Sequence, residues 1–198
     1  GFIESHGHLL GIGQNMLNLD VRGKTVDEIV LAVKEQARMQ PKDTWIRGRG
    51  WDQNLWPNKT FPHARMLDSA TSEHPVYLRR VDGHAVWLNK KALLLARITK
   101  ESKTPEGGLI VKDTDGEPTG VLVDRAIDLV APLIDNFDDH DYEQFLKLGS
   151  NQALSYGITS FHDAGADRKT LDLYTGYAKK NLLSLRIYAM IDGSDEKL

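Results

Sequence analysis

Apolar residues recur at helical spacing in four stretches of the chain. The first stretch follows Thr25-Val26-Asp27-Glu28, whose spacing lets the Thr hydroxyl and the Glu carboxylate bind free amides at a helix start. The third stretch is closed by Gly157, and glycine favours the position just after a helix. The pattern predicts helices at about 25–39, 90–96, 138–156 and 168–180.

Shorter stretches, several with apolar side chains at alternate positions, predict β-strands. These strands cover 1–5, 45–49, 75–80, 85–88, 107–112, 118–123, 158–161 and 185–191. Between two of them, Asp113-Thr114-Asp115-Gly116 predicts a hairpin. From residue 138 onward, helix and strand alternate with short links, which is typical of parallel βα units.

The change of rhythm near residue 138 predicts three segments. Residues 1–17 are a strand and the loop that follows it, residues 18–135 are an α/β insertion with its own small core, and residues 136–198 are βα units. The chain opens inside a predicted strand and stops soon after another. We therefore expect it to be a piece of a longer protein.

Composition narrows the functional classes. The 198 residues are 40% hydrophobic and 27% charged, as in a globular protein, and the net charge of −3 gives no basic excess for a nucleic-acid partner. There are no cysteines, which excludes disulfides, thiolate zinc ligands and thiol catalysis. No apolar run approaches the roughly 20 residues that span a bilayer, so we expect no membrane partner.

The sharpest local motif is His6-Gly7-His8, at the end of the first predicted strand. Residues i and i+2 of a strand point to the same face, so the two imidazoles should project side by side. Such a pair forms half of a Zn²⁺ site, with about 2.0–2.1 Å between the metal and each nitrogen. The alternative is that the motif is a surface turn or the remnant of a purification tag.

Polar residues at strand ends and on aromatic-rich loops are the other candidates for a site. His162 and Asp163 follow a predicted strand and could line a pocket; alternatively, His162 bonds a neighbouring loop and Asp163 caps a helix. Trp51 and Asp52 lie on the predicted loop 50–57, although a Trp can equally pack in a core. His84 follows an Asp-Gly turn and precedes a strand, and both a binding and a structural role remain open for it.

Several spaced segments together resemble the amidohydrolase superfamily, in its YtcJ-like subgroup, also called amidohydrolase family 3. They are residues 1–8 (GFIESHGH), 45–53 (WIRGRGWDQ), 80–85 (RVDGHA), 116–122 (GEPTGVL) and 157–165 (GITSFHDAG). The resemblance covers essentially the whole chain. Where the family often has Glu after the Gly-Val-Leu segment, this chain has Asp124, and a shorter carboxylate there would alter a substrate pocket.

The resemblance implies an α/β fold, namely strands 1–3 of a metal-dependent hydrolase (β/α)₈ barrel with a large α/β insertion after strand 1. It implies that His6 and His8 bind a divalent metal, zinc in the first instance. Trp51, Asp52, His84, His162 and Asp163 would then line the substrate side. The remaining ligands and the general base, a strand-eight Asp, would lie beyond residue 198.

The function that follows is hydrolysis of a non-peptide carbon–nitrogen bond, in an amide or N-acyl small molecule, by metal-activated water. The rivals are a catalytically incompetent fragment or inactive homologue that serves as a binding module, and a hydrolase of C–O or P–O bonds. Three strands of a barrel leave open sheet edges, so we expect residues 1–198 alone to be inactive, to bind zinc weakly and to form homo-oligomers.

Overall fold

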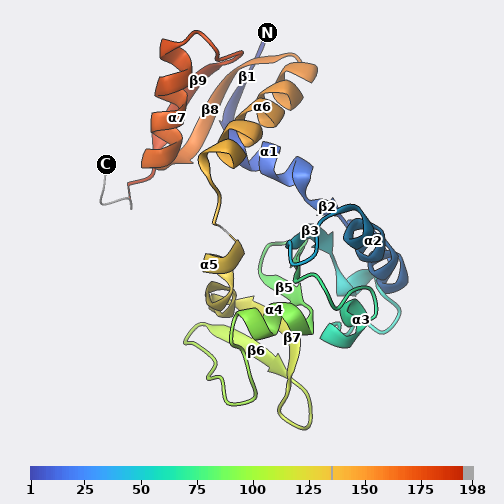
Figure 1. The fold of residues 1–198 in the computed structure, drawn as a ribbon. Helices are drawn as coiled ribbons and strands as arrows, with labels where there is room; N and C mark the ends of the chain where they lie inside the picture. The colour runs from blue at the N-terminus through green and yellow to red at the C-terminus, as the bar shows by residue number, and fades with distance from the viewer. Residues whose placement is uncertain (135, 194–198) are drawn as a thin grey trace. The chain divides into compact units, whose positions relative to one another are not determined.

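The computed structural model describes residues 1–134 and 136–193 and is mixed α/β, as predicted (Figure 1). The chain divides into two compact units. Unit 1 comprises Gly1–Leu17 and Phe137–Leu198, and unit 2 comprises Asn18–Asn136. No helix in the described part of the chain is both long and apolar enough to cross a membrane.

Unit 1 is a parallel three-stranded sheet with helices packed on it. Its elements are β1 (Phe2–Gly7), α1 (Leu9–Leu17), α6 (Asp139–Ser155), β8 (Ile158–Ala166), α7 (Arg168–Lys179) and β9 (Arg186–Ile191). The strand order is β1-β8-β9, and both pairings are parallel, as the alternation of helix and strand predicts. Figure 1 shows the three helices on one side of these strands.

Helix α1 corrects the prediction that a loop follows the first strand. The reason lies in two glycines at the contact between α1 and α6. A Cβ on Gly13 would lie 1.9 Å from the Phe145 carbonyl oxygen, and a Cβ on Gly149 would lie 2.2 Å from that of Leu9. Glycine lowers helix propensity in the sequence of α1, but here it lets two helix backbones touch.

Unit 2 is built on a mixed six-stranded sheet of order β2-β3-β4-β5-β7-β6. The strands are β2 (Leu19–Asp20), β3 (Ile46–Trp51), β4 (Val76–Arg80), β5 (Ala85–Leu88), β6 (Gly108–Lys112) and β7 (Pro118–Asp124). Strands β2, β3 and β4 run parallel, and β4, β5, β7 and β6 pair antiparallel. The predicted hairpin is confirmed as β6–β7.

Short helices cover this sheet. They are α2 (Val26–Met39), η1 (Gln53–Leu55), α3 (Ala64–Asp68), α4 (Lys90–Leu95), η2 (Arg125–Leu129) and α5 (Ala131–Ile134). The predicted capping box of α2 is confirmed, because Thr25 accepts from the amide of Glu28 and the Glu28 carboxylate accepts from the amide of Thr25. Alternate strand residues feed two apolar clusters, one with Val86 and Leu122 and the other with Trp51 and Trp87.

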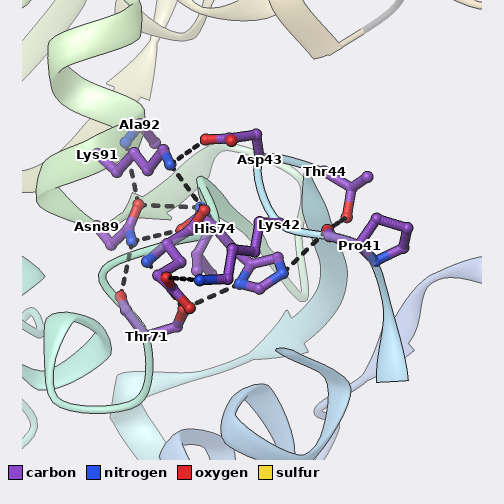
Figure 2. A network of polar contacts seen from close by, with 11 residues as sticks. Pro41, Lys42, Asp43, Thr44, Thr71, His74, Asn89, Lys91 and Ala92 are labelled. Atoms are coloured by element: carbon purple, nitrogen blue, oxygen red, sulfur yellow. Dashed lines mark hydrogen bonds and ion pairs between the residues drawn. The ribbon is translucent and has the colours of Figure 1, made fainter. Parts of the chain in front are cut away.

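A buried polar network holds the start of α4 to the segment before β4 (Figure 2). Asn89 is fully buried; its side-chain oxygen accepts from the amides of Val76 (2.9 Å) and Ala92 (3.0 Å), and its Nδ2 donates to the His74 carbonyl (2.9 Å). The His74 ring also has a partner at each nitrogen, the Thr71 hydroxyl and a backbone carbonyl. Each side-chain nitrogen and oxygen of Asn89 and His74 thus has a hydrogen-bond partner within this network. Buried polar side chains with their hydrogen bonds made in this way stabilise the fold.

Candidate metal and substrate site

The site begins with the two faces of the unit 1 sheet. Phe161 and Asp163 of β8 are buried, whereas the alternating residues Ser160, His162 and Ala164 are half-buried. Phe161 belongs to the apolar cluster that contains Leu9, Leu146 and Tyr174 from the three helices. The opposite face of the sheet therefore carries the half-buried side chains of β8.

The sequence around the first strand places two histidines on that opposite face. Gly7 lies opposite Asp163 in the pairing of β1 with β8, and a Cβ on Gly7 would lie 2.5 Å from the Phe161 ring. A side chain at position 7 would thus point toward the helices, and the side chains of its neighbours His6 and His8 point away from them. The intervening glycine is required because the Phe161 ring fills the space that a side chain would need.

The two imidazoles lie beside each other, as the strand alternation predicts. Their ring centroids are 6.1 Å apart, and the ring planes are nearly perpendicular at 76°. The Nδ1 of His8 lies 2.9 Å from the backbone oxygen of Ala164. A carbonyl only accepts, so Nδ1 of His8 is the donor in this bond, and in the neutral tautomer that the bond selects the Nε2 lone pair is available to a ligand. In many metal-binding histidines, one ring nitrogen binds the metal and the other donates to a carbonyl or carboxylate, which fixes the tautomer and the orientation of the ring.

This arrangement fits half of a metal site. Two neighbouring imidazoles, one of them held in the ligating tautomer, provide two nitrogen donors for a divalent metal such as zinc. Among residues 1–134 and 136–193, no group of three or more His, Cys, Asp and Glu side chains is placed to hold an ion. A complete catalytic site needs a third protein ligand, so the remaining donors have to come from elsewhere.

Asp163 lies on the helix-covered face of the sheet, opposite to the face that carries the two histidines. It is buried, and its carboxylate accepts from the amide of Leu9 (2.7 Å) and from the hydroxyl of Tyr174 (2.8 Å). Burial and the Asp163 charge raise the pKa of the Tyr174 hydroxyl, which therefore remains a proton donor. Leu9 is the first residue of α1 and directly follows His8, so these bonds position the start of α1 beside His8. We therefore assign Asp163 to positioning instead of to direct substrate contact.

Replacing Asp163 by Asn should destabilise unit 1 by about 2 kcal/mol, because a carboxamide has one acceptor oxygen for two buried donors. Tyr174→Phe, which removes a single donor, should have about half that effect. Amide hydrogen exchange at Leu9 measures the outcome directly. Unchanged protection of Leu9 in Asp163→Asn would contradict the assignment.

His162 lies within β8, because the strand continues to Ala166 past its predicted end at residue 161. Its ring centroid is 5.2 Å from that of Tyr188 on β9, and the two residues are paired in the sheet. Tyr188 is 64% exposed, so this ring pair is open to a ligand. The sequence offered no signal for Tyr188 beyond its place in a predicted strand.

The unit 2 candidates occupy three different environments. Trp51 is fully buried, at the end of β3 instead of on a loop, and its Nε1 donates to the Leu78 carbonyl at 2.7 Å. No ligand can reach that ring, so we correct its assignment from the substrate site to the core. Asp52 caps η1 by accepting from the amide of Asn54 (2.9 Å). His84 is exposed, and its Nδ1 lies 2.8 Å from the Asp124 carboxylate.

The comparisons with known proteins agree with the sequence motifs. A model of the amidohydrolase family matches residues 1–197, and the chain belongs to this family. It is 37% identical over 163 residues to the putative amidohydrolase YtcJ of Bacillus subtilis (strain 168), covering 82% of this chain and 31% of that protein. The predicted YtcJ-like resemblance is thereby confirmed.

One further relative and one solved structure of similar fold extend the comparison. The N-substituted formamide deformylase of Arthrobacter pascens is 28% identical over 181 residues, which are 88% of this chain and 33% of that protein. The crystal structure of an uncharacterized metal-dependent hydrolase from Pyrococcus horikoshii OT3 superposes with a TM-score of 0.70 at 22% identity, over 96% of this chain and 36% of that chain. The chain thus spans about a third of the length of the relatives it matches.

Proposed function

We propose that this chain is part of a metal-dependent hydrolase that cleaves a non-peptide carbon–nitrogen bond in a small amide or N-acyl compound. The observation that carries the proposal is the pair His6 and His8, with the His8 Nδ1 bonded to Ala164 and its Nε2 free for a ligand. Membership of the amidohydrolase family supports it, as do the names of a formamide deformylase and of metal-dependent hydrolases among the similar proteins.

In this proposal, the sheet of unit 1 provides strands 1–3 of a (β/α)₈ barrel. The parallel order β1-β8-β9, with helices on one face and histidines on the other, supports such an arrangement. Unit 2 would be an insertion after the first strand. Catalytic residues of barrel enzymes lie at the C-terminal ends of the strands, which is where β1 ends in His6 and Gly7.

The residues of this chain would act by holding and orienting. When bound, a divalent metal, zinc in our proposal, supplies a polarised water and an electrophile for the carbonyl of the substrate. His6 and His8 would hold the metal, with His8 kept in place by the Ala164 carbonyl and by the Asp163–Leu9 bond in the next residue. His162 and Tyr188 would contact the substrate from the same face of the sheet. The general base would come from outside residues 1–198.

The test is an activity assay of the complete gene product on a panel of N-formyl and N-acyl amines. We expect chelator-sensitive release of the amine, and a loss of more than about 100-fold in kcat/KM for His8→Ala, since even outer-shell changes cost 10–100-fold. His140→Ala is a matched control, because His140 is exposed on α6. Residues 1–198 alone should show no turnover.

The alternative is a binding module without catalysis, favoured by the presence of only two clustered ligand histidines among the described residues. The same assay, extended to ester and phosphoester substrates, separates the two. Metal binding without turnover of any amide, C–O or P–O substrate would support the binding module. Turnover that survives His8→Ala would contradict both.

A further inference from the structure

Unit 2 contains a cleft of its own, and one of its lining residues, His84, is a residue that the family resemblance places on the substrate side. The cleft has a volume of about 520 Å³ and lies where β3 and β4 end and β5 begins. Arginine, aspartate and histidine side chains line it, together with Ile127. All of these residues belong to unit 2, so the cleft is formed within a single compact unit.

Two neighbouring arginines in this cleft are not paired with a carboxylate in the described part of the chain. Arg49 and Arg79 are directly paired across the parallel strands β3 and β4, and both are exposed. Arg49 donates to the Val81 carbonyl (3.4 Å) and Arg79 to the Gly83 carbonyl (3.1 Å). In the described part of the chain, neither forms an ion pair. Two guanidinium charges at paired strand positions repel each other, and both attract an anion that comes near them.

The acidic groups of the cleft already have side-chain partners other than Arg49 and Arg79. Asp82 receives two hydrogen bonds from Arg80 (2.9 and 2.7 Å), which lower the pKa of Asp82. Asp124 faces the His84 ring at 2.8 Å, and Asp128 lies 3.9 Å from Arg125. Asp82 and Asp128 are thus each paired with an arginine other than Arg49 and Arg79, and Asp124 is paired with the His84 ring.

The backbone at Asp124, whose carboxylate contacts the His84 ring, is strained. Its φ of 49° and ψ of −126° lie in a region of backbone conformation that residues other than glycine rarely adopt. The Asp124 amide donates to the His84 carbonyl (2.9 Å), while its carboxylate orients the His84 ring. Strain of this kind persists where the surrounding structure fixes a residue, and it is concentrated at ligand sites.

From this geometry we propose that the cleft binds the carboxylate of a small organic acid between Arg49 and Arg79, with His84 beside it. Guanidinium groups present planar pairs of donors that match a carboxylate. The side chain of Ile127 gives the organic part an apolar wall. This site does not depend on the metal or on the hydrolytic activity.

The experiment titrates N-acetylglycine into residues 1–198 at pH 7 and low salt, followed by NMR signals of the Arg Nε–H groups and of amides 79–84. Matched titrations use the uncharged amide of N-acetylglycine and inorganic phosphate. We expect millimolar binding of the acid, with shifts confined to the cleft, and weaker binding of both comparison compounds.

Arg79→Met and Arg49→Met keep most of the side-chain length but remove the charge, and each should weaken binding of the acid by about 10-fold or more. Arg65→Met is the control, because Arg65 is exposed on α3 and is not among the residues that line the cleft. Circular dichroism verifies that each variant is folded. Equal binding of the acid and its amide, tighter binding of phosphate, or equal effects of Arg79→Met and Arg65→Met would each overturn the proposal.

Discussion

Gly13→Ala is expected to destabilise unit 1 by about 3 kcal/mol, at the upper end of the range for overpacked interiors. The added methyl group would lie 1.9 Å from the Phe145 carbonyl oxygen and 2.6 Å from its carbon. These are backbone atoms of α6, so no side-chain rotation relieves the overlap, and α1 has to move away. Hydrogen exchange of the α6 amides over a denaturant series measures the loss.

The matched control is Gly11→Ala in the same helix. Its Cβ would lie 3.4 Å from the Cβ of His8, an ordinary contact. Since alanine favours a helix interior over glycine by about 0.5–1 kcal/mol, this variant should be slightly more stable than the parent chain. Equal destabilisation by Gly11→Ala and Gly13→Ala would show that α1 and α6 do not touch as described.

Asn89→Ala is expected to destabilise unit 2 by about 3 kcal/mol, which combines the loss of a helix cap with the loss of partners for buried groups. The amides of Val76 and Ala92 and the carbonyl of His74 would each lose a hydrogen bond in a place that water does not reach. Asn89→Asp should be comparably harmful, because it restores the acceptor but sets a buried charge against a carbonyl.

Tryptophan fluorescence measures this effect in unit 2 specifically, because all four tryptophans (Trp45, Trp51, Trp56 and Trp87) lie in that unit. Lys90→Ala is the control: Lys90 is the exposed neighbour of Asn89, and its loss should change stability by less than about 0.5 kcal/mol. A midpoint for Asn89→Ala that matches that of Lys90→Ala would contradict the network in Figure 2.

Local signals in the sequence predicted the elements whose causes are themselves local. The Thr25–Glu28 capping box starts α2, Asn89 caps α4, and Gly157 follows α6 with a φ of 76°. The proximity of the two histidines also follows from the chain alone, since strand alternation places His6 and His8 on one face.

Features that depend on distant residues could not be predicted in this way. Helix α1 was not predicted because Gly11 and Gly13 weaken its helical pattern. Gly13 is needed because it contacts the backbone of α6, more than 130 residues further along the chain. Trp51 lies in a sequence typical of a loop, but its indole donates to the carbonyl of Leu78, which lies 27 residues further along the chain. The Arg49–Arg79 pair results from the register of two strands, which no local pattern specifies.

The central claim is that His6 and His8 hold the metal of a hydrolase, and elemental analysis of the purified complete gene product tests it most directly. We predict bound zinc in the parent protein and in His140→Ala, and its loss from His6→Ala and His8→Ala. Zinc retained equally by all four proteins, or bound by none of them after reconstitution, would contradict the assignment of the His6–His8 pair.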